Sequence, residues 1–516
     1  KYFKLNIKKT CSSSTGFFLK TLSQIQLIMK LKNLKYLFLS MTLIVFNSCE
    51  EDEEDAGMMV QEMVEIRSGN ANFDKFVSIG ASITAGYTDG ALFFEGQRSS
   101  YPNIMAGVMS LSQDNTVASN YTQPYMNDNI GGLLLGGNQI VGPRLFFNGA
   151  GPQSLGDLGA TPTTELMNSV AGPYSNMAVP GAQAIHMIAP GYGNLAGVAT
   201  GTANPYAVRV MSSPGSSIIQ DVLAQSPTFV SVWSGGNDAL GYATSGGAGT
   251  LTSSADFEFA FGSTMAALAQ VPGGVVSNIP DVTAIAYLNT IPYNAVPLDA
   301  ATADLLNGGF AAYNGGLAAA QAFGLISAEE VTNRTIIFVE GLNAVTMEDE
   351  YLTNLSSLGL PSWRQATMND KIILPAIGLI GTTVDGNPTQ INGVSVPLAD
   401  GIVLSSDEIA EAQARIVQFN ATIETITAQQ GWALYDAYGI LNQAVTQGVA
   451  FDDYVMTTDL VFGGFFSLDG VHTTARGSAL IANGMMEAID AHYGSNLSDA
   501  AAKAADYPTN YSPNLR

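Results

Sequence analysis

The chain has 516 residues, of which 47% are hydrophobic and only 12% are charged, a composition typical of a folded protein rather than a disordered one. The formal net charge is −24, and all of the acidic residues follow residue 48. A protein this acidic repels phosphate backbones, so nucleic-acid binding is excluded from the expected functions.

Residues 1–48 are expected to be upstream sequence and a signal peptide. The segment MKLKNLKYLFLSMTLIVFNSCEEDEED has a basic start and then an apolar run that is too short to span a membrane. This layout predicts export, with cleavage either near Ser48 or directly before Cys49. We favour the second, because FNSC resembles a bacterial lipobox and the acidic residues 50–55 resemble the surface-export signal of Bacteroidetes lipoproteins. A lipidated Cys49 would anchor the protein to a membrane without spanning it.

After an acidic tether over residues 49–72, apolar runs that predict buried strands alternate with helical patterns. This alternation predicts an α/β fold, a three-layer α/β/α sandwich in which helices cover both faces of a mainly parallel sheet. The strands are expected at residues 73–80, 227–236, 282–290, 334–341 and 431–437, and the helices at 255–271, at 405–431 and from about Thr473 or Thr474 to Gly494.

Residues 73–494 are therefore expected to form one domain, followed by a C-terminal tail over residues 495–516. Two regions interrupt the alternation: 88–170 is rich in Gly, Asn, Pro and Tyr, and 341–404 contains short apolar pieces and several prolines. We interpret both as loop insertions at the end of the sheet where ligand sites of such folds lie.

Ser82, in FVSIGASITAGY, follows the first expected strand and precedes a helical pattern. A hydroxyl at this place lies near helix amides that favour developing negative charge, which suits a nucleophile. The alternative interpretation is a turn serine that only caps the helix. The stretch is not a G-x-S-x-G elbow, because Thr84 stands where that motif has its last glycine.

Two further turns carry candidate ligand groups. Asn237, in SVWSGGNDAL, could donate its side-chain amide to an oxyanion, and Gly181, in NMAVPGAQA, could bring a bare backbone N–H close to a ligand. Both also fit ordinary turns.

The stretch FSLDGVHTTARG places Asp469 three residues before His472, one of only three histidines in the chain. The carboxylate can accept a hydrogen bond from a ring N–H, which orients the imidazole as a base for a weakly nucleophilic serine. A histidine that only packs or caps is the alternative. His186 has no acid close by in sequence and His492 lies late in the last helix, so both are poorer candidates.

In chain order, GASITAG, NMAVPGA, GGND and DGVH resemble the four motifs of the SGNH hydrolases, also called the GDSL esterase/lipase family. The stretches DGALFFEGQRSSYPNIMA and FSLDGVHTTARGSALIANGMMEAI resemble the lipoprotein branch of that family in Bacteroidetes. The resemblance covers about residues 73–494 and implies a flavodoxin-like sheet. Ala81 departs from the pattern, since the family has Asp before its serine.

The resemblance implies a role for each matching residue. Ser82 would attack an ester carbonyl, His472 would act as general base and then general acid, and Asp469 would hold His472. The oxyanion hole would consist of the backbone N–H groups of Ser82 and Gly181 and the side-chain amide of Asn237. No metal or other cofactor is expected, because cysteines and histidines are too few for a structural zinc site and no phosphate-binding G-x-x-x-x-G-K-[ST] run occurs.

These features together predict a serine esterase that cleaves carboxylic esters through an acyl-enzyme, in a lipoprotein of the outer membrane exposed at the cell surface. The expected substrates are esters of small molecules, acyl lipids or acetylated carbohydrate. Two alternatives stay open: a surface lipoprotein that binds glycan or lipid without catalysis, and a subunit of an outer-membrane assembly.

Overall fold

The computed structural model describes residues 64–113, 116–168 and 172–516, which belong to one compact unit, Val64–Arg516. The signal peptide, Cys49 and the first part of the tether lie outside the described residues. Residues 64–72 pack against the folded body, because Ile66 and Ala71 join the core and the Asn70 N–H donates to the Tyr493 carbonyl over 2.8 Å.

The centre of the fold is a parallel sheet in the order β1 (Phe76–Gly80), β6 (Phe229–Trp233), β7 (Gly273–Ser277) and β16 (Ala433–Tyr435). Asn176 adds a parallel bridge to the free side of β1. Counting that segment, the strand order by sequence is 2-1-3-4-5, the flavodoxin-like order. The expected α/β fold is therefore confirmed.

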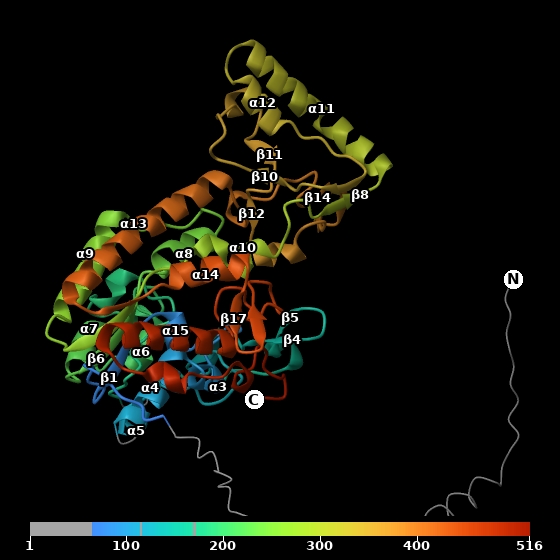
Figure 1. Cartoon of the computed structure of the whole chain (residues 1–516). Coiled ribbons are helices and arrows are strands. Elements are labelled where there is room, and N and C mark those ends of the chain that lie inside the picture. Colours follow the sequence, from blue (N-terminus) through green and yellow to red (C-terminus); the bar gives the residue numbers. More distant parts are fainter. Residues whose placement is uncertain (1–63, 114–115, 169–171) are drawn as a thin grey trace, which may run out of the picture. The chain divides into compact units, whose positions relative to one another are not determined.

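Helices cover both faces of this sheet (Figure 1). The helices α4 (Tyr101–Met109) and α15 (Ala475–Tyr493) contact each other, and α15 also contacts β16. A second group consists of α8 (Asn237–Thr244), α9 (Ser254–Ala267) and α13 (Ser406–Gln430). Every residue of β1, β6 and β7 is buried between the layers, which explains why their sequences are apolar apart from one serine in each strand.

The longest predicted helices begin and end where their capping residues indicate. The Ser405 Oγ accepts the Glu408 N–H at the start of α13, and Gly431 ends that helix in the left-handed conformation. Thr474 caps α15 in the same way, and Gly494 ends it. The strand expectations at β1, β6 and β16 and the helix expectation at α9 are also confirmed.

Two expected strands are wrong. Residues 282–290 form η5 (Val282–Ala284) and α10 (Ala286–Asn289), and the strand of this part of the chain is β7, directly before them. Residues 335–339 run extended without a strand partner. Asparagine side chains of α11 (Ala300–Ala322) replace the missing strand: Asn314 bonds both the N–H and the carbonyl of Ile336, and Asn307 does the same for Phe338.

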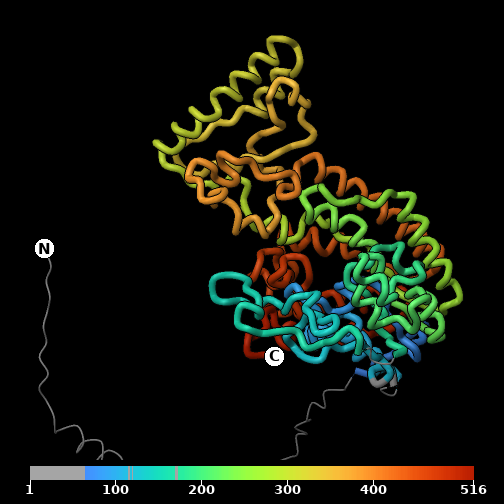
Figure 2. Tube along the Cα trace, turned by 180° about the vertical axis from the view of Figure 1, so that it is seen from behind, coloured from blue at the N-terminus to red at the C-terminus, as the bar shows by residue number. Residues whose placement is uncertain are grey.

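The second insertion begins before residue 341. In it α11 contacts α12 (Ala328–Arg334), which contacts β11 (Trp363–Gln365). Four short antiparallel pairs in the described residues complete this part, and Figure 2 shows it as one group in yellow and orange. The pairs are β8 (Val296–Leu298) with β9 (Gly341–Asn343), β10 (Thr346–Glu348) with β11, β12 (Lys371–Ile372) with β15 (Val403–Leu404), and β13 (Thr383–Val384) with β14 (Asn387–Ile391).

The other insertion is held by the C-terminal residues. It forms the hairpins β2 (Leu133–Leu135) with β3 (Asn138–Val141) and β4 (Leu145–Phe147) with β5 (Pro152–Ser154). The fully buried Arg144 donates to the carbonyls of Ser512 and Leu515 over 2.8 and 2.9 Å. Residues 495–516 are therefore packed onto the body rather than forming a free tail.

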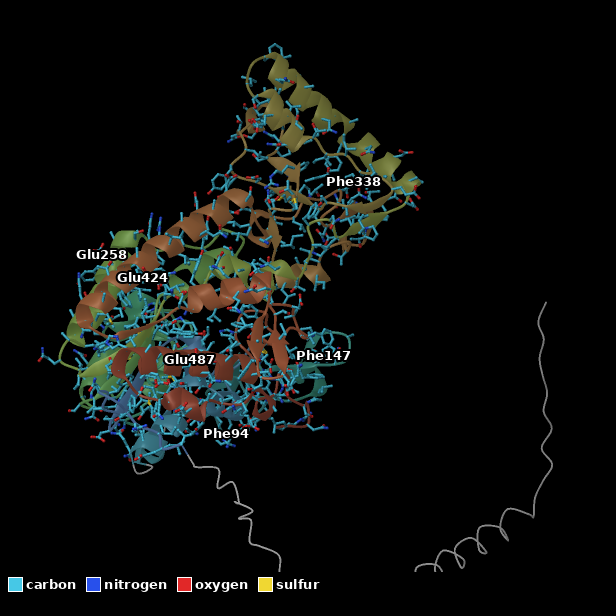
Figure 3. The ribbon with its side chains drawn as sticks, viewed as in Figure 1. Phe94, Phe147, Glu258, Phe338, Glu424 and Glu487 are labelled. Atoms are coloured by element: carbon cyan, nitrogen blue, oxygen red, sulfur yellow. The ribbon has the colours of Figure 1, made fainter. Side chains whose placement is uncertain are left out.

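The exterior of the helix layers carries uncompensated acids. Glu258, Glu424 and Glu487 are exposed on α9, α13 and α15, where Figure 3 labels them. Within the described residues, no helix combines the length and the apolar character needed to cross a bilayer.

The packing of β7 supplies a test of the sheet. A Cβ on Gly274 would overlap the Trp432 ring and the Val230 carbonyl, whereas a Cβ on Gly308 of α11 would meet nothing within 4 Å. Gly274→Ala should therefore lower the free energy of unfolding by about 1–3 kcal/mol. Gly308→Ala should leave it unchanged or raise it by up to about 1 kcal/mol. Urea denaturation of both variants measures the difference, and equal effects would contradict the close packing at β7.

Candidate active site

The candidate residues gather where the parallel strands end. Ser82 begins α2 (Ser82–Ala85) two residues after β1, and Asn237 begins α8 four residues after β6. Asp469 and His472 lie on the loop that leads into α15. Because parallel strands have their carboxyl ends at one edge, loops from distant parts of the chain meet there.

Asp469 and His472 form the hydrogen bond that their spacing predicts. The His472 Nδ1 lies 2.8 Å from the Asp469 Oδ2. The other carboxylate oxygen, Oδ1, accepts the backbone N–H groups of Val471 and His472, each over 2.9 Å. Burial alone would raise the pKa of Asp469, but the adjacent His472 and these N–H donors outweigh it and lower the pKa to about 2. Asp469 is therefore ionised at neutral pH.

The turn at residues 87–90 supports this pair, and the sequence did not indicate it. The Gly90 N–H donates to the Asp469 Oδ2 over 2.8 Å. The Tyr87 ring lies 4.6 Å from the His472 ring, and its hydroxyl donates to the Gly90 carbonyl over 2.6 Å. The turn therefore fixes both the carboxylate and one face of the imidazole.

Asp89 is a second buried carboxyl in the same turn. Its N–H donates over 3.0 Å to the Ser467 Oγ, which in turn donates to the Asp469 Oδ1 over 3.1 Å. The Asp89 Oδ1 accepts the Leu468 N–H over 3.1 Å, and its Oδ2 has no partner among the described residues. Burial is the main cause that raises the pKa of Asp89 to about 7, and the charge of Asp469 adds to it. Its φ of +52° is unusual for a residue other than glycine.

Ser82 and His472 line the same pocket, of about 70 Å³. The Ser82 side chain forms no hydrogen bond to His472 or to any other residue in the described parts of the chain. Asn237 lines this pocket as well, and its Nδ2 donates over 2.9 Å to the carbonyl of Ala182. The third predicted donor, Gly181, does not line the pocket. Gly181 has a φ of +82° and lies in the turn that the Ala182 N–H closes. Asn237 connects this turn to the pocket through its hydrogen bond to the Ala182 carbonyl.

Three N–H groups near the pocket are free to bind a ligand. In the described residues, the backbone N–H groups of Ser82 and Gly181 donate to no protein acceptor. One of the two N–H bonds of the Asn237 side-chain amide is also left over, since the amide donates once, to Ala182.

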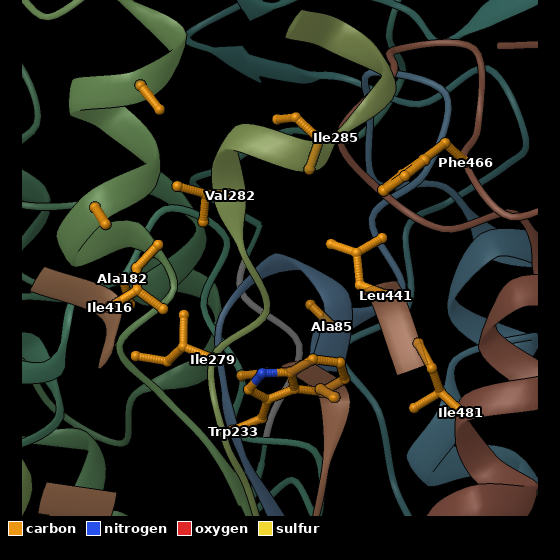
Figure 4. Close-up of a cluster of buried hydrophobic side chains, with 14 of the residues drawn as sticks. Ala85, Ala182, Trp233, Ile279, Val282, Ile285, Ile416, Leu441, Phe466 and Ile481 are labelled. Atoms are coloured by element: carbon orange, nitrogen blue, oxygen red, sulfur yellow. The ribbon is translucent and has the colours of Figure 1, made fainter. Parts of the chain in front are cut away.

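Apolar side chains form most of the pocket wall, and the sequence indicated none of them as site residues. Figure 4 shows three of them, Trp233, Val282 and Ile285, within the buried cluster next to the site. Val282 and Ile285 belong to the apolar run that predicts a strand, and that pattern concealed their place at the site. The other apolar residues of the wall are Ala81, Ile83, Leu240, Pro280 and Val471.

The remaining histidines have structural partners. The His186 Nδ1 accepts the Gln183 N–H over 2.9 Å, and its ring stacks on Tyr192 at 4.2 Å. The His492 Nε2 lies 2.8 Å from the Gly431 carbonyl at the end of α13. Neither belongs to the pocket, as their sequence context indicated.

Other features of the described chain lie apart from this pocket. A hollow of about 780 Å³ is bordered by Arg209 and Met211, and one of about 740 Å³ lies between Tyr313 and Trp363 in the second insertion. Glu350, Asp400 and Glu408 bring carboxylate oxygens within 4.8 Å of one another and could hold a metal ion. None of these residues lines the pocket of Ser82.

No protein-family model matches the chain, and neither a curated protein nor a solved structure matches it significantly. The function of the protein is therefore inferred from its fold and from the geometry of the pocket.

The buried carboxyl of Asp89 predicts a pH-dependent stability. Because its pKa is raised to about 7, the folded protein keeps a proton that the unfolded chain loses near pH 4. The stability due to Asp89 is thus fully present below about pH 4, declines as pH rises towards 7, and stays low above it. Asp89→Asn cannot ionise, so it should raise the free energy of unfolding relative to wild type at pH 8 more than at pH 5.

Denaturant titrations at the two pH values provide the measurement. The exposed Asp453 supplies the control, because Asp453→Asn removes the same charge from the surface. An equal response of the two variants to pH would contradict the assignment.

Proposed function

We propose that the protein is a serine esterase of the SGNH, or GDSL, type that cleaves carboxylic esters through an acyl-enzyme. The observation that carries the proposal is the 2.8 Å hydrogen bond between Asp469 and His472 at a pocket that Ser82 also lines. A base oriented by a buried carboxylate, next to a serine with no other partner, is the arrangement that serine acyl transfer requires.

His472 has one ring nitrogen left for the reaction. Asp469 engages Nδ1, so Nε2 can accept the proton of the Ser82 hydroxyl while the serine oxygen attacks the ester carbonyl carbon. The imidazolium then gives that proton to the departing alcohol, and the acyl group stays on Ser82. Water attacks the acyl-enzyme with His472 again as base, which releases the carboxylic acid and restores the serine. The ionised Asp469 stabilises the imidazolium in both steps.

The free N–H groups around the pocket are suited to the oxyanion of each tetrahedral intermediate. We assign this role to the backbone N–H groups of Ser82 and Gly181 and to the unused N–H of Asn237. Ala81 lines the pocket beside Ser82, in the position of the family's Asp. Its methyl group takes no part in these steps.

We further propose that a lipid on Cys49 anchors the enzyme at the outer membrane, where it faces the cell exterior. An acyl lipid or an acetylated carbohydrate is the matching substrate class, and the acidic body disfavours nucleic acid. One observation favours non-catalytic glycan or lipid binding as a second function. The hollow of the second insertion is bordered by Trp363, Tyr313 and the highly exposed Phe323.

Labelling with a fluorophosphonate probe tests the nucleophile. The wild-type protein should be labelled on Ser82, as peptide mapping would reveal, and both Ser82→Ala and His472→Ala should lose the label. With a chromogenic ester as substrate, Ser82→Ala should lower kcat by roughly 10⁴-fold or more. Asn237→Ala should lower it by about 100- to 1000-fold, as expected for one oxyanion donor.

The matched controls are Ser110→Ala, a buried serine whose hydroxyl donates to the Gly107 carbonyl, and His492→Ala. Both should retain label and activity. A folded wild-type protein that takes up no label would overturn the esterase proposal in favour of the binding function.

The small apolar pocket predicts a preference for short acyl groups. The pocket of about 70 Å³ is small and mostly apolar, so we expect it to favour a short acyl chain. The ratio of kcat/KM for p-nitrophenyl acetate to kcat/KM for p-nitrophenyl octanoate should exceed about tenfold. Ile285→Ala should reduce this ratio by about tenfold, because removing part of the wall enlarges the pocket. The exposed Ile377 provides the control, and Ile377→Ala should leave the ratio unchanged. Faster cleavage of octanoate by wild type would contradict this acyl site.

A further inference from the structure

A group of acids lies where the second insertion meets α13. Glu350 follows β10, Asp400 opens η8 (Asp400–Ile402), and Glu408 lies in the first turn of α13. One carboxylate oxygen from each comes within 4.8 Å of the other two. Glu350 in the second insertion therefore meets two acids, Asp400 and Glu408, that lie fifty or more residues further along the chain.

No positive charge compensates this group. None of the three acids forms an ion pair within the described residues, and the charged neighbours that act on Glu350 are further carboxylates, Asp349 and Glu411 among them. Glu411 already accepts two hydrogen bonds, from the hydroxyls of Tyr351 and Tyr242, over 2.8 and 3.2 Å. Glu350, Asp400 and Glu408 thus lie together without a positively charged side chain paired to them in the described residues.

Glu408 provides a second observation, independent of the clustering. Its side chain is only 1% exposed, yet it reaches the shared point. The Oε2 atom accepts the Ser405 N–H over 2.7 Å, as in an ordinary capping box, whereas the buried Oε1 accepts no hydrogen bond in the described parts of the chain. A buried carboxylate oxygen without a donor is costly unless a ligand satisfies it.

The neighbouring backbone makes room for that oxygen. A Cβ on Gly247 would overlap the Glu408 carboxylate, and the φ of Gly247 is +84°. Only glycine meets both conditions without strain. Glu408 is thus held inward at a position where a helix cap alone would leave a glutamate at the surface.

We propose that Glu350, Asp400 and Glu408 bind a calcium ion, which ties the second insertion to α13. Oxygen ligands at about 2.3–2.6 Å from one ion lie at most about 5 Å apart, which matches the spacing here. Carboxylates without histidine or cysteine select a hard cation over zinc or copper. Calcium tolerates irregular protein ligand sets, whereas magnesium prefers to keep most of its water.

Calcium-dependent stability of the full chain tests the site. The protein is stripped with EDTA, and thermal unfolding is followed while CaCl₂ or MgCl₂ is added. Wild type should show a higher Tm with calcium than with magnesium at equal concentration. Glu350→Gln, a substitution at an exposed position, should bind calcium at least about tenfold more weakly by titration calorimetry.

The same variant should show a second, opposite effect. In EDTA, Glu350→Gln removes repulsion, so its Tm should equal or exceed that of wild type. Asp407→Asn is the matched control, because it removes one exposed charge from the same helical turn outside the group. It should keep the calcium response of wild type.

Two outcomes would overturn the site: wild type without calcium binding or a calcium-dependent Tm, or Asp407→Asn losing the response as fully as Glu350→Gln. Fluorophosphonate labelling of Ser82 reports on a different part of the chain, so the esterase proposal stands or fails separately.

Discussion

The parallel pairing of β1 with β6 and of β6 with β7 is the constraint on which the rest of the structure depends. The register pairs Gly80 with Trp233, so both strands end at the same edge of the sheet. The segments that follow them begin with Ser82 and Asn237, and the segment after β7 brings Val282 and Ile285 to the same place. A single sheet edge thus brings together a serine hydroxyl, an amide donor and an apolar wall from segments about two hundred residues apart in sequence.

Burying a carboxylate costs free energy, and three buried carboxylates of this acidic chain offset that cost in different ways. Asp469 remains ionised because His472, two backbone N–H groups and the Gly90 N–H surround it. Asp89, within the same network, receives fewer donors, and burial raises its pKa to about 7. Glu408 lies among other acids, and we attribute its burial to a cation. The number of donors that each carboxylate receives decides which solution applies.

The second insertion has its own rigid base next to the acid group. Arg364 bonds Asp349 over 2.5 Å and Asp370 over 2.7 Å, and all three side chains are almost completely buried. Asp349 directly precedes Glu350, and Asp370 accepts the Ser406 N–H at the start of α13 over 3.0 Å. A fixed ion pair and the proposed calcium site would therefore both hold the insertion on the same helix.

Local sequence patterns were enough to locate the elements that a capping residue or a continuous apolar run marks. Ser405 and Gly431 delimit α13, Thr474 and Gly494 delimit α15, and the apolar runs of β1 and β6 could be interpreted directly, because caps and burial act over one or two turns. The Asp469–His472 hydrogen bond belongs to this group, since three residues on one loop suffice to form it.

Only the tertiary structure decided where short apolar runs without such signals belong. Residues 282–290 have the composition of a strand, but the position in the sheet belongs to β7, where Gly274 packs closely against Trp432. Residues 335–339 are extended, yet Ile336 and Phe338 bond to Asn314 and Asn307 of a helix rather than to a strand. The support that the turn at residues 87–90 gives to Asp469, and the burial that raises the pKa of Asp89, could likewise not be inferred from the sequence. Such contacts join segments that are 22 to 379 residues apart, and their energies depend on desolvation, which exists only once the chain has folded.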